Sequence, residues 1–461
     1  MYALRKSGVG DARALGRRTL LALLAGAAAA PALRPSRLWA ATPERPLLFA
    51  NCRVFDGRRL LDGFNVLVAG NKIAGLPPVA EQVANAETIE CGGRVLMPGL
   101  IDAHWHTLLA AVAEIVALTA DVAYVHLVAA REAERTLLRG FTAVRDVGGP
   151  AFALKRAIDE GIVAGPRIYP SGAMLSQTSG HGDFRLRSDL PSSAQDPLFA
   201  FEAAGISVVA DGADAVLRRT REQLMLGASQ IKIMTGGGVS SLHDPLDSLQ
   251  YTPAEIQAAV AAAGDWGTYV AAHVYTAAGI RRSVENGVAS IEHGQLADED
   301  AVRLMADKGT WWSLQPFLAD EDANPKSLPE QQRQQREIAE GTERAYELGK
   351  KHGVKLAFGT DILFSPGRTA SQGRQLAKLA RWFDSAEVLA MATSRNAELL
   401  ALSGPRNPYP AALGVIEAGA YADLLVIDGN PLENLALIGN PDASLKLVMK
   451  DGQIFKNQLA G

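Results

Sequence analysis

Cysteine, surplus charge and long apolar runs are all scarce in this sequence, and each scarcity excludes a class of protein. Only Cys52 and Cys91 occur among 461 residues, which excludes a disulfide-based scaffold and a cysteine-based zinc site. We expect two unpaired thiols, with a disulfide as the alternative if the chain is exported. The formal net charge is −4 and no basic patch is present, so nucleic acid is not expected as a partner. A hydrophobic content of 48% is ample for a large core and typical of a globular α/β enzyme.

The first 41 residues have the composition of an export signal. Arg17 and Arg18 precede an apolar run from Leu20 to Ala30, and small residues follow up to Ala41. The run is shorter than the about 20 apolar residues that span a bilayer, so we expect no membrane association after cleavage. The adjacent arginines resemble a twin-arginine signal, with a Sec signal or an uncleaved anchor as alternatives. We predict that residues 1–41 direct export to the periplasm.

Two histidines close the apolar stretch that ends at His106. His104 and His106 are two residues apart, and such residues share one face of a strand, so both imidazoles can reach one metal ion. Four more residues of suitable chemistry stand at or near the ends of other β-like apolar runs: Lys232, His273, His293 and Asp361. Packing alone does not explain five metal-binding residues and a lysine at strand ends. The pattern therefore predicts a metal site.

Strand-like and helical stretches alternate through the centre of the chain. The predicted strands are 95–101, 142–146, 167–171, 230–234, 269–273, 290–293, 311–314 and 355–359. The helical stretches between them include 125–139, 213–226, 253–263 and 331–352. Eight such units predict an α/β fold, a (β/α)8 TIM barrel over residues 97–404 with its active site at the carboxyl ends of the strands. A doubly wound open sheet is the alternative, but it gathers ligands only at its switch point.

Short strands separated by turn residues occupy both ends of the remaining chain. They cover 47–55, 64–69 and 72–75 near the beginning, and 422–429 and 445–452 near the end. We predict that residues 42–96 and 405–461 together form one small composite β-sandwich domain beside the barrel.

These motifs resemble the amidohydrolase superfamily, in its imidazolonepropionase-like and prolidase-like branch. The likeness spans nearly everything after the leader, including the closing segment Ala-Asp-Leu-Leu-Val-Ile-Asp-Gly-Asn-Pro. The lysine lies in Ile-Lys-Ile-Met-Thr-Gly-Gly-Gly, the two later histidines in Ala-Ala-His-Val-Tyr and Ile-Glu-His-Gly, and the aspartate in Gly-Thr-Asp. All six ligand positions are filled, and the resemblance implies a site for two divalent metal ions, usually zinc.

The resemblance also implies a role for each ligand. One metal would take His104, His106 and Asp361, and the other His273 and His293. Lys232 would be N-carboxylated, and its carbamate would bridge both ions; a structural salt bridge is the alternative for a lysine in isolation. Asp361 would take a proton from the hydroxide that the metals share and pass it to the leaving amine, with a helix N-cap as its alternative.

A glycine-flanked loop after the third strand supplies further candidates. His181 resembles the histidine that polarises the scissile carbonyl in the prolidase-like branch, and Tyr275 resembles the tyrosine that assists it. Both are predicted to be catalytic and to contact substrate. The alternative for His181 is a loop-stabilising hydrogen bond to Asp183. Arg185 is a further candidate contact, to a substrate carboxylate, with surface solvation as its alternative.

The sequence thus predicts a metal-dependent hydrolase that cleaves an amide bond by attack of a metal-bridged hydroxide. The expected substrates are small molecules, namely an X-Pro or other dipeptide, an N-acyl amino acid, or a larger aromatic amide such as a mycotoxin. The alternative is a cyclic amidohydrolase or deaminase of the imidazolonepropionase kind. Lys232 counts against it, because those sites typically use one metal and lack this lysine. A non-catalytic scaffold disagrees with six filled ligand positions. We also expect a homo-oligomer.

Overall fold

The computed structural model describes residues 45–193, 196–241, 243–324 and 326–459. The predicted export signal, residues 1–41, lies outside them. Within the described ranges, no helix combines the length and the apolar character that crossing a membrane requires. Cys52 and Cys91 are both free thiols, as expected.

Parallel strands fill the centre of the described chain. They are β8 (Leu100–Trp105), β9 (Phe141–Asp146), β10 (Arg167–Pro170), β11 (Met174–Ser176), β12 (Ser207–Val209), β13 (Ile231–Met234), β14 (Val270–Thr276), β15 (Ser290–Leu296), β16 (Trp311–Leu314) and β17 (Lys355–Phe358). They form two sheets, with the orders β10-β9-β8 and β12-β11-β13-β14-β15-β16-β17. Nearly all their residues are buried, which explains why these strands are mostly apolar on both faces and do not alternate between apolar and polar residues.

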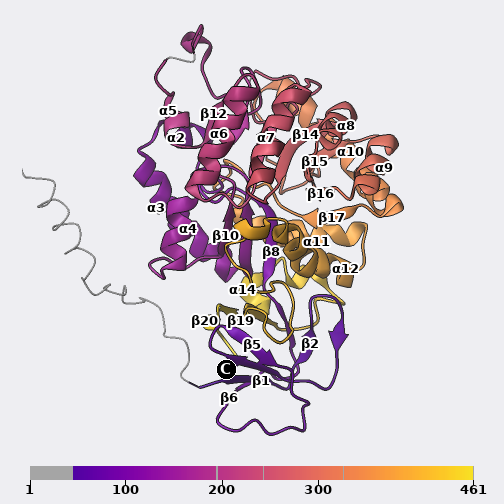
Figure 1. Ribbon diagram of the computed structural model, residues 1–461. Coiled ribbons are helices and arrows are strands. Elements are labelled where there is room, and N and C mark those ends of the chain that lie inside the picture. The colour runs from indigo at the N-terminus through magenta and orange to yellow at the C-terminus, as the bar shows by residue number, and fades with distance from the viewer. Residues whose placement is uncertain (1–44, 194–195, 242, 325, 460–461) are drawn as a thin grey trace, which may run out of the picture. The chain divides into compact units, whose positions relative to one another are not determined.

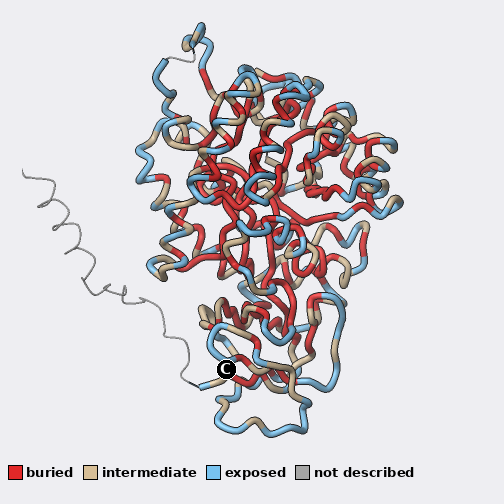
Figure 2. The backbone as a smooth tube through the Cα atoms, in the orientation of Figure 1, coloured by how far each residue is buried: buried red, intermediate tan, exposed pale blue. Residues whose placement is uncertain are grey.

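Helices follow most of these strands and lie outside them (Figure 1). They are α2 (Glu114–Thr119), α3 (Val122–Leu138), α4 (Phe152–Asp159), α5 (Ala200–Ala203), α6 (Ala213–Leu226), α7 (Pro253–Asp265), α8 (Ala277–Glu285), α9 (Glu299–Lys308), α10 (Pro329–His352), α11 (Gln372–Ala377), α12 (Ser385–Ala390) and α13 (Asn396–Ala401). Figure 2 shows buried residues in the interior and exposed residues along the outer helices. The helix predicted over 213–226 matches α6 to the residue, because Gly227 ends it in the left-handed conformation.

Two further sheets lie at the ends of the described chain, with the orders β5-β4-β1-β6 and β20-β19-β18-β7-β2-β3, and the second combines strands from both ends. Their strands are β1 (Leu47–Ala50), β2 (Arg53–Phe55), β3 (Leu60–Leu61), β4 (Val66–Ala69), β5 (Lys72–Gly75), β6 (Glu87–Glu90), β7 (Val95–Pro98), β18 (Leu424–Ile427), β19 (Leu445–Lys450) and β20 (Gln453–Asn457), with the short helix α14 (Pro441–Ser444) before β19. Because β18 pairs antiparallel with β7, the C-terminal segment lies directly against the N-terminal one. Apolar side chains of both sheets, such as Phe49 and Val426, form one buried cluster.

The strand predicted over 95–101 is two strands in the structure. β7 belongs to the mixed sheet in which it pairs antiparallel with β18 and parallel with β2, and the strand that carries His104 begins at Leu100. Gly99 separates them, and a Cβ atom there would overlap the side chain of Thr142. The predicted boundary was therefore wrong, because the chain changes sheets at a point where only glycine fits.

The third predicted strand, 167–171, agrees with β10 to within one residue, and β11 follows it as a strand that was not predicted. β10 pairs with β9 and β11 pairs with β13, so these two consecutive strands belong to different parallel sheets. At the other edge, the backbone N–H of Asp361, just after β17, donates to the carbonyl of His104 in β8 at 2.8 Å. The mixed α/β fold is confirmed, while the hydrogen-bonded ladders form two parallel sheets and not one closed ring.

Candidate metal centre and active site

The six predicted ligands line a single cavity at the carboxyl ends of the parallel strands. His104 lies in β8, Lys232 in β13, His273 in β14 and His293 in β15, while His106 and Asp361 follow β8 and β17. The same cavity is lined by His181 and Tyr275. The structure thus brings together, from five strands, residues as far apart in sequence as His104 and Asp361.

His104, His106 and Asp361 form the tightest group. Asp361 Oδ1 lies 3.3 Å from His104 Nε2 and 3.1 Å from His106 Nε2. One potential ligand atom from each of the three falls within 4.8 Å of the others, which is the spacing that one shared cation requires.

The imidazole rings of the remaining histidines continue from this group. Ring centroids are 4.8 Å apart for His104 and His293, 4.5 Å for His293 and His273, and 4.0 Å for His273 and His181. The four rings therefore form a continuous row along the cavity.

Each ligand histidine has one ring nitrogen held by the protein. The held atoms and their partners are His104 Nδ1 with Glu292 Oε2 (2.8 Å), His106 Nδ1 with the Gly148 carbonyl (3.2 Å), His273 Nε2 with the Gly237 carbonyl (3.2 Å) and His293 Nδ1 with Gln315 Oε1 (2.9 Å). Since all four partners are acceptors, the held nitrogens carry the protons. The opposite nitrogens of His104 and His106 both face Asp361, so a cation between them could take a lone pair from each ring and an oxygen of the carboxylate.

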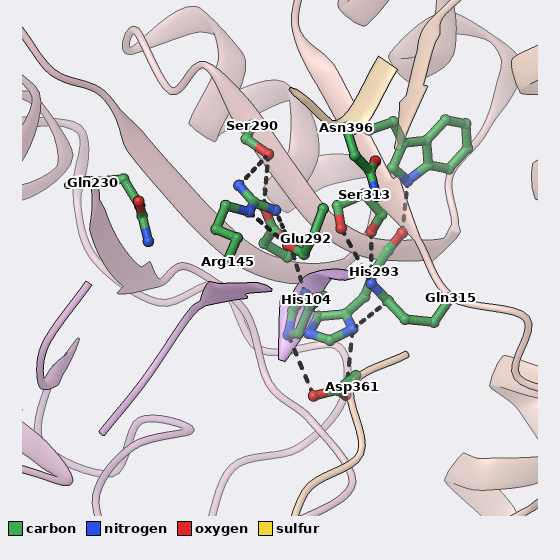
Figure 3. A network of polar contacts seen from close by, with 12 residues as sticks. His104, Arg145, Gln230, Ser290, Glu292, His293, Ser313, Gln315, Asp361 and Asn396 are labelled. Atoms are coloured by element: carbon green, nitrogen blue, oxygen red, sulfur yellow. Dashed lines mark hydrogen bonds and ion pairs between the residues drawn. The ribbon is translucent and has the colours of Figure 1, made fainter. Parts of the chain in front are cut away.

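A buried ion pair stands behind His104 (Figure 3). One guanidinium nitrogen of Arg145 lies 2.7 Å from both carboxylate oxygens of Glu292, and neither side chain is exposed to solvent. Burial works to raise the pKa of Glu292, but Arg145 and His104 hold it well below its usual range. Glu292 therefore stays ionised and fixes the orientation of His104.

Sequence reasoning missed Glu292 and Arg145. A signal was available, because a charged residue inside a buried strand is rare unless it is paired. Glu292 directly precedes His293 in β15, and Arg145 lies inside β9. Their positions within apolar strands therefore indicated a buried ion pair.

The electrostatics of the cavity suit cation binding. Burial lowers the pKa of His273 and of His293 well below the usual range, so both imidazoles are neutral at pH 7. Burial acts in the opposite direction on Asp361, but His104 and His106 hold its pKa well below that of an ordinary aspartate. Neutral nitrogens and an ionised carboxylate are the donors that zinc prefers. The donor set therefore fits a divalent metal.

Lys232 is 1% exposed and lies among these ligands. No side chain of the described residues forms a hydrogen bond with the Lys232 ammonium group or an ion pair within 4.0 Å of it. The structural salt bridge that was the alternative for Lys232 is therefore absent among these residues. Burial lowers its pKa to about 8, which increases the share of neutral amine at neutral pH.

His181 enters the cavity from its loop and stacks on His273 with the rings 10° from parallel. Its Nδ1 lies 2.9 Å from Ser241 Oγ and 3.1 Å from Asp244 Oδ2. The alternative partner, Asp183, is instead bound to Ser179 and Arg185. Gly238 faces the ring where a Cβ atom would overlap it, so glycine is required there. The loop thus aims the free Nε2 edge of His181 at the site.

Tyr275 and Arg185, the other two predicted substrate contacts, differ in position. Tyr275 is buried, stacks on His293 with centroids 5.0 Å apart, and borders the cavity. Arg185 is not among the described residues that line the cavity. Its guanidinium group lies 2.6 Å from Asp183 Oδ2, within its own loop. The structure brings Tyr275 to the ligands and leaves Arg185 apart from them.

Comparison with known proteins identifies the family. Residues 95–455 match the Amidohydrolase family. The chain is 34% identical to the ochratoxinase of Aspergillus niger over 340 residues, which cover 71% of this chain and 68% of the relative. The chain belongs to the amidohydrolase family. As an amidohydrolase, it is a hydrolase of amide bonds that acts on small molecules, and the metal ions typical of the family agree with the candidate site.

Solved amidohydrolase structures resemble the described chain closely. An amidohydrolase is 38% identical with a TM-score of 0.81, covering 89% of this chain and 99% of its own. A prolidase complexed with N-methylphosphonate-L-proline is 36% identical with a TM-score of 0.82, covering 90% and 100%. The A. niger ochratoxinase structure is 28% identical with a TM-score of 0.79, covering 90% and 96%.

Proposed function

We propose that this amidohydrolase cleaves an amide bond in one of three substrate classes. These are dipeptides, including X-Pro dipeptides, N-acyl amino acids, and larger aromatic amides such as mycotoxins. The observation that carries the proposal is the gathering of Lys232 with four histidines and Asp361 in one cavity. The prolidase and the ochratoxinase among the relatives support this choice of substrate classes.

The proposal includes two divalent ions, with zinc as the metal that suits this donor set best. His104, His106 and Asp361 would hold one ion and His273 and His293 the other. Lys232, buried without an anionic partner among the described residues, would be N-carboxylated and bridge the two. Bound ions of this kind supply a Lewis acid for the carbonyl and lower the pKa of water to about 7.

The chain's own residues would move the protons and hold the substrate. Asp361, held ionised by two histidines, would accept a proton from the attacking water and return it to the leaving amine. His181 would donate from Nε2 to the scissile carbonyl oxygen, while Ser241 and Asp244 hold its Nδ1 edge. Tyr275 would support the same carbonyl from the adjacent wall of the cavity.

We propose that the two parallel sheets close into the predicted (β/α)8 barrel of residues 97–404. The direct succession of β10 and β11, one in each sheet, supports closure on one side, and the hydrogen bond from the Asp361 N–H to the His104 carbonyl supports it on the other. The two mixed sheets of residues 42–96 and 405–461 would form the β-sandwich around their shared cluster. An experimental structure tests both points.

Export and self-association complete the proposal. If residues 1–41 are an export signal, the N-terminus of the native protein begins between Ala30 and Thr42, and N-terminal sequencing measures it. An intact Met1 in a cytoplasmic fraction would contradict export. Light scattering of the purified protein measures whether it is the expected homo-oligomer.

Hydrolysis assays test the reaction itself. The zinc-loaded protein is offered X-Pro dipeptides, N-acyl amino acids and aromatic amides, and release of the free amine is followed. We expect turnover in at least one class, and none with Lys232→Ala. Turnover confined to cyclic amides, or release of ammonia from an amino-substituted ring, would contradict the proposal and favour the deaminase alternative.

A further inference from the structure

A second cavity, of about 810 Å³ including its open mouth, adjoins the metal cavity. The two share the walls formed by Val239, Ser240, Tyr275, Asp361 and Leu363. A molecule in the outer cavity can therefore reach the metal ligands directly. Much of the wall of the outer cavity is apolar, including Phe317, Leu318, Ile338 and Ile362.

Two carboxylates in the outer cavity are already neutralised. Lys378 Nζ lies 2.8 Å from Asp320 Oδ2 and 3.0 Å from Asp322 Oδ2. Arg374 also pairs with Asp322 at 2.6 Å. These groups form a closed set that does not need a ligand for its charge balance.

Lys326 differs from the other lysine of this cavity. Among the described residues, Ser240 is the only one whose side chain accepts a hydrogen bond from the Lys326 ammonium group, with 3.4 Å between Nζ and Oγ. No described carboxylate lies within 4.0 Å of its ammonium group. Burial nevertheless lowers the pKa of Lys326, while the more distant Glu114 and Asp361 act to raise it. Lys326 is thus a partly buried ammonium group with no carboxylate in direct contact, and a carboxylate from a ligand could supply that contact.

We propose that Lys326 binds a carboxylate of the substrate, so that the preferred substrate carries a free carboxylate and an apolar or aromatic group beside its scissile amide. This inference rests on the proposed function. The contact with Ser240, which borders both cavities, puts Lys326 at their junction, and the apolar walls accommodate the remainder of the molecule.

Arg368 is the competing cation in the same cavity. Its guanidinium group donates to the backbone carbonyl of Glu321 at 2.9 Å, an exposed contact on a loop. It has no link to Ser240 or to the inner cavity among the described contacts. Lys326 is therefore the better placed of the two.

Two substrates that differ in one group test the assignment. N-acetyl-L-phenylalanine has the carboxylate, and N-acetyl-L-phenylalaninol has the same scissile amide without it. We expect Lys326→Met to lower kcat/KM for the first by about 10- to 100-fold, the range for a hydrogen bond to a charged group, and to change the second less than about twofold. Lys326→Arg should recover part of the loss. Lys308→Met, at the exposed end of α9, is the matched control and should change neither.

A binding measurement separates this inference from the reaction. Calorimetric titration of the zinc-loaded protein with L-phenylalanine and L-phenylalaninol should give tighter binding of the carboxylate, and Lys326→Met should abolish that preference. A protein that shows this preference but hydrolyses no N-acyl amino acid, dipeptide or aromatic amide would overturn the proposed function alone. Equal effects of Lys326→Met on both compounds, no effect, or loss of the preference through Arg368→Met instead would overturn the assignment.

Discussion

Replacing Glu292 with glutamine removes one charge from the core behind the metal centre and keeps the shape of the side chain. Arg145 would then face a neutral amide, although its side chain is wholly excluded from solvent and its two contacts at 2.7 Å are to the lost charge. Breaking a buried ion pair from one side costs about 3–5 kcal/mol. We expect that loss in the free energy of unfolding of the metal-free protein.

The same substitution weakens the orientation of His104, whose Nδ1 donates to Glu292 at 2.8 Å. Loss of such a supporting group lowers metal affinity by about 10- to 100-fold. Urea unfolding of the metal-free protein and competition against a chelating dye measure the two effects separately.

Two controls define what Glu292→Gln must show. Glu299→Gln removes an exposed carboxylate that pairs with Arg303 and Lys351 on the surface, so stability and metal affinity should hardly change. In Arg145→Met/Glu292→Gln no unpaired charge is left, so the double variant should lose less stability than the sum of its single variants. A Glu292→Gln protein as stable and as metal-avid as Glu299→Gln would refute the reasoning.

Three other substitutions give further expectations. Asp361→Asn keeps an oxygen but removes the proton acceptor, so kcat should fall at least about 10²–10⁴-fold with much of the metal retained; near wild-type turnover would assign the base elsewhere. His181→Ala should lower kcat/KM at unchanged metal content, and unchanged kinetics would leave His181 with a structural role in its loop. Burial, with Arg167 nearby, lowers the pKa of Lys450 to about 8. Between about pH 8 and about pH 10.4, Lys450 is protonated in the unfolded chain but mostly neutral in the folded protein. Lys450 therefore makes the free energy of unfolding of the wild type rise with pH across this range. Unfolding curves across this range should show a smaller rise in Lys450→Met, and an equal rise would contradict the assignment.

The positions of the predicted metal ligands in the fold were accessible from the sequence because they depend on local pattern. His104 and His106 follow an apolar run with a spacing of two, and a parallel α/β arrangement puts strand ends at one face. The same logic placed Lys232 and His273 correctly, since their strands are short, apolar and buried.

What the sequence did not reveal depends on packing between distant segments. Arg145 and Glu292 are 147 residues apart, and nothing local couples them. His181 was paired with its neighbour Asp183 in one interpretation, but the partner is Asp244 from another loop. Gly99 marks a change of sheet that an uninterrupted apolar run conceals, because the close approach of Thr142 exists only in the folded chain.

Metal stoichiometry tests the central claim most directly. Protein purified without chelator and reloaded with zinc is analysed for metal per chain, beside Lys232→Ala. A site that Lys232 bridges predicts two zinc ions per chain in the wild type and a clear loss in the variant, with partial recovery on adding a short carboxylate. One zinc ion or fewer in the wild type, or two in Lys232→Ala, would contradict it.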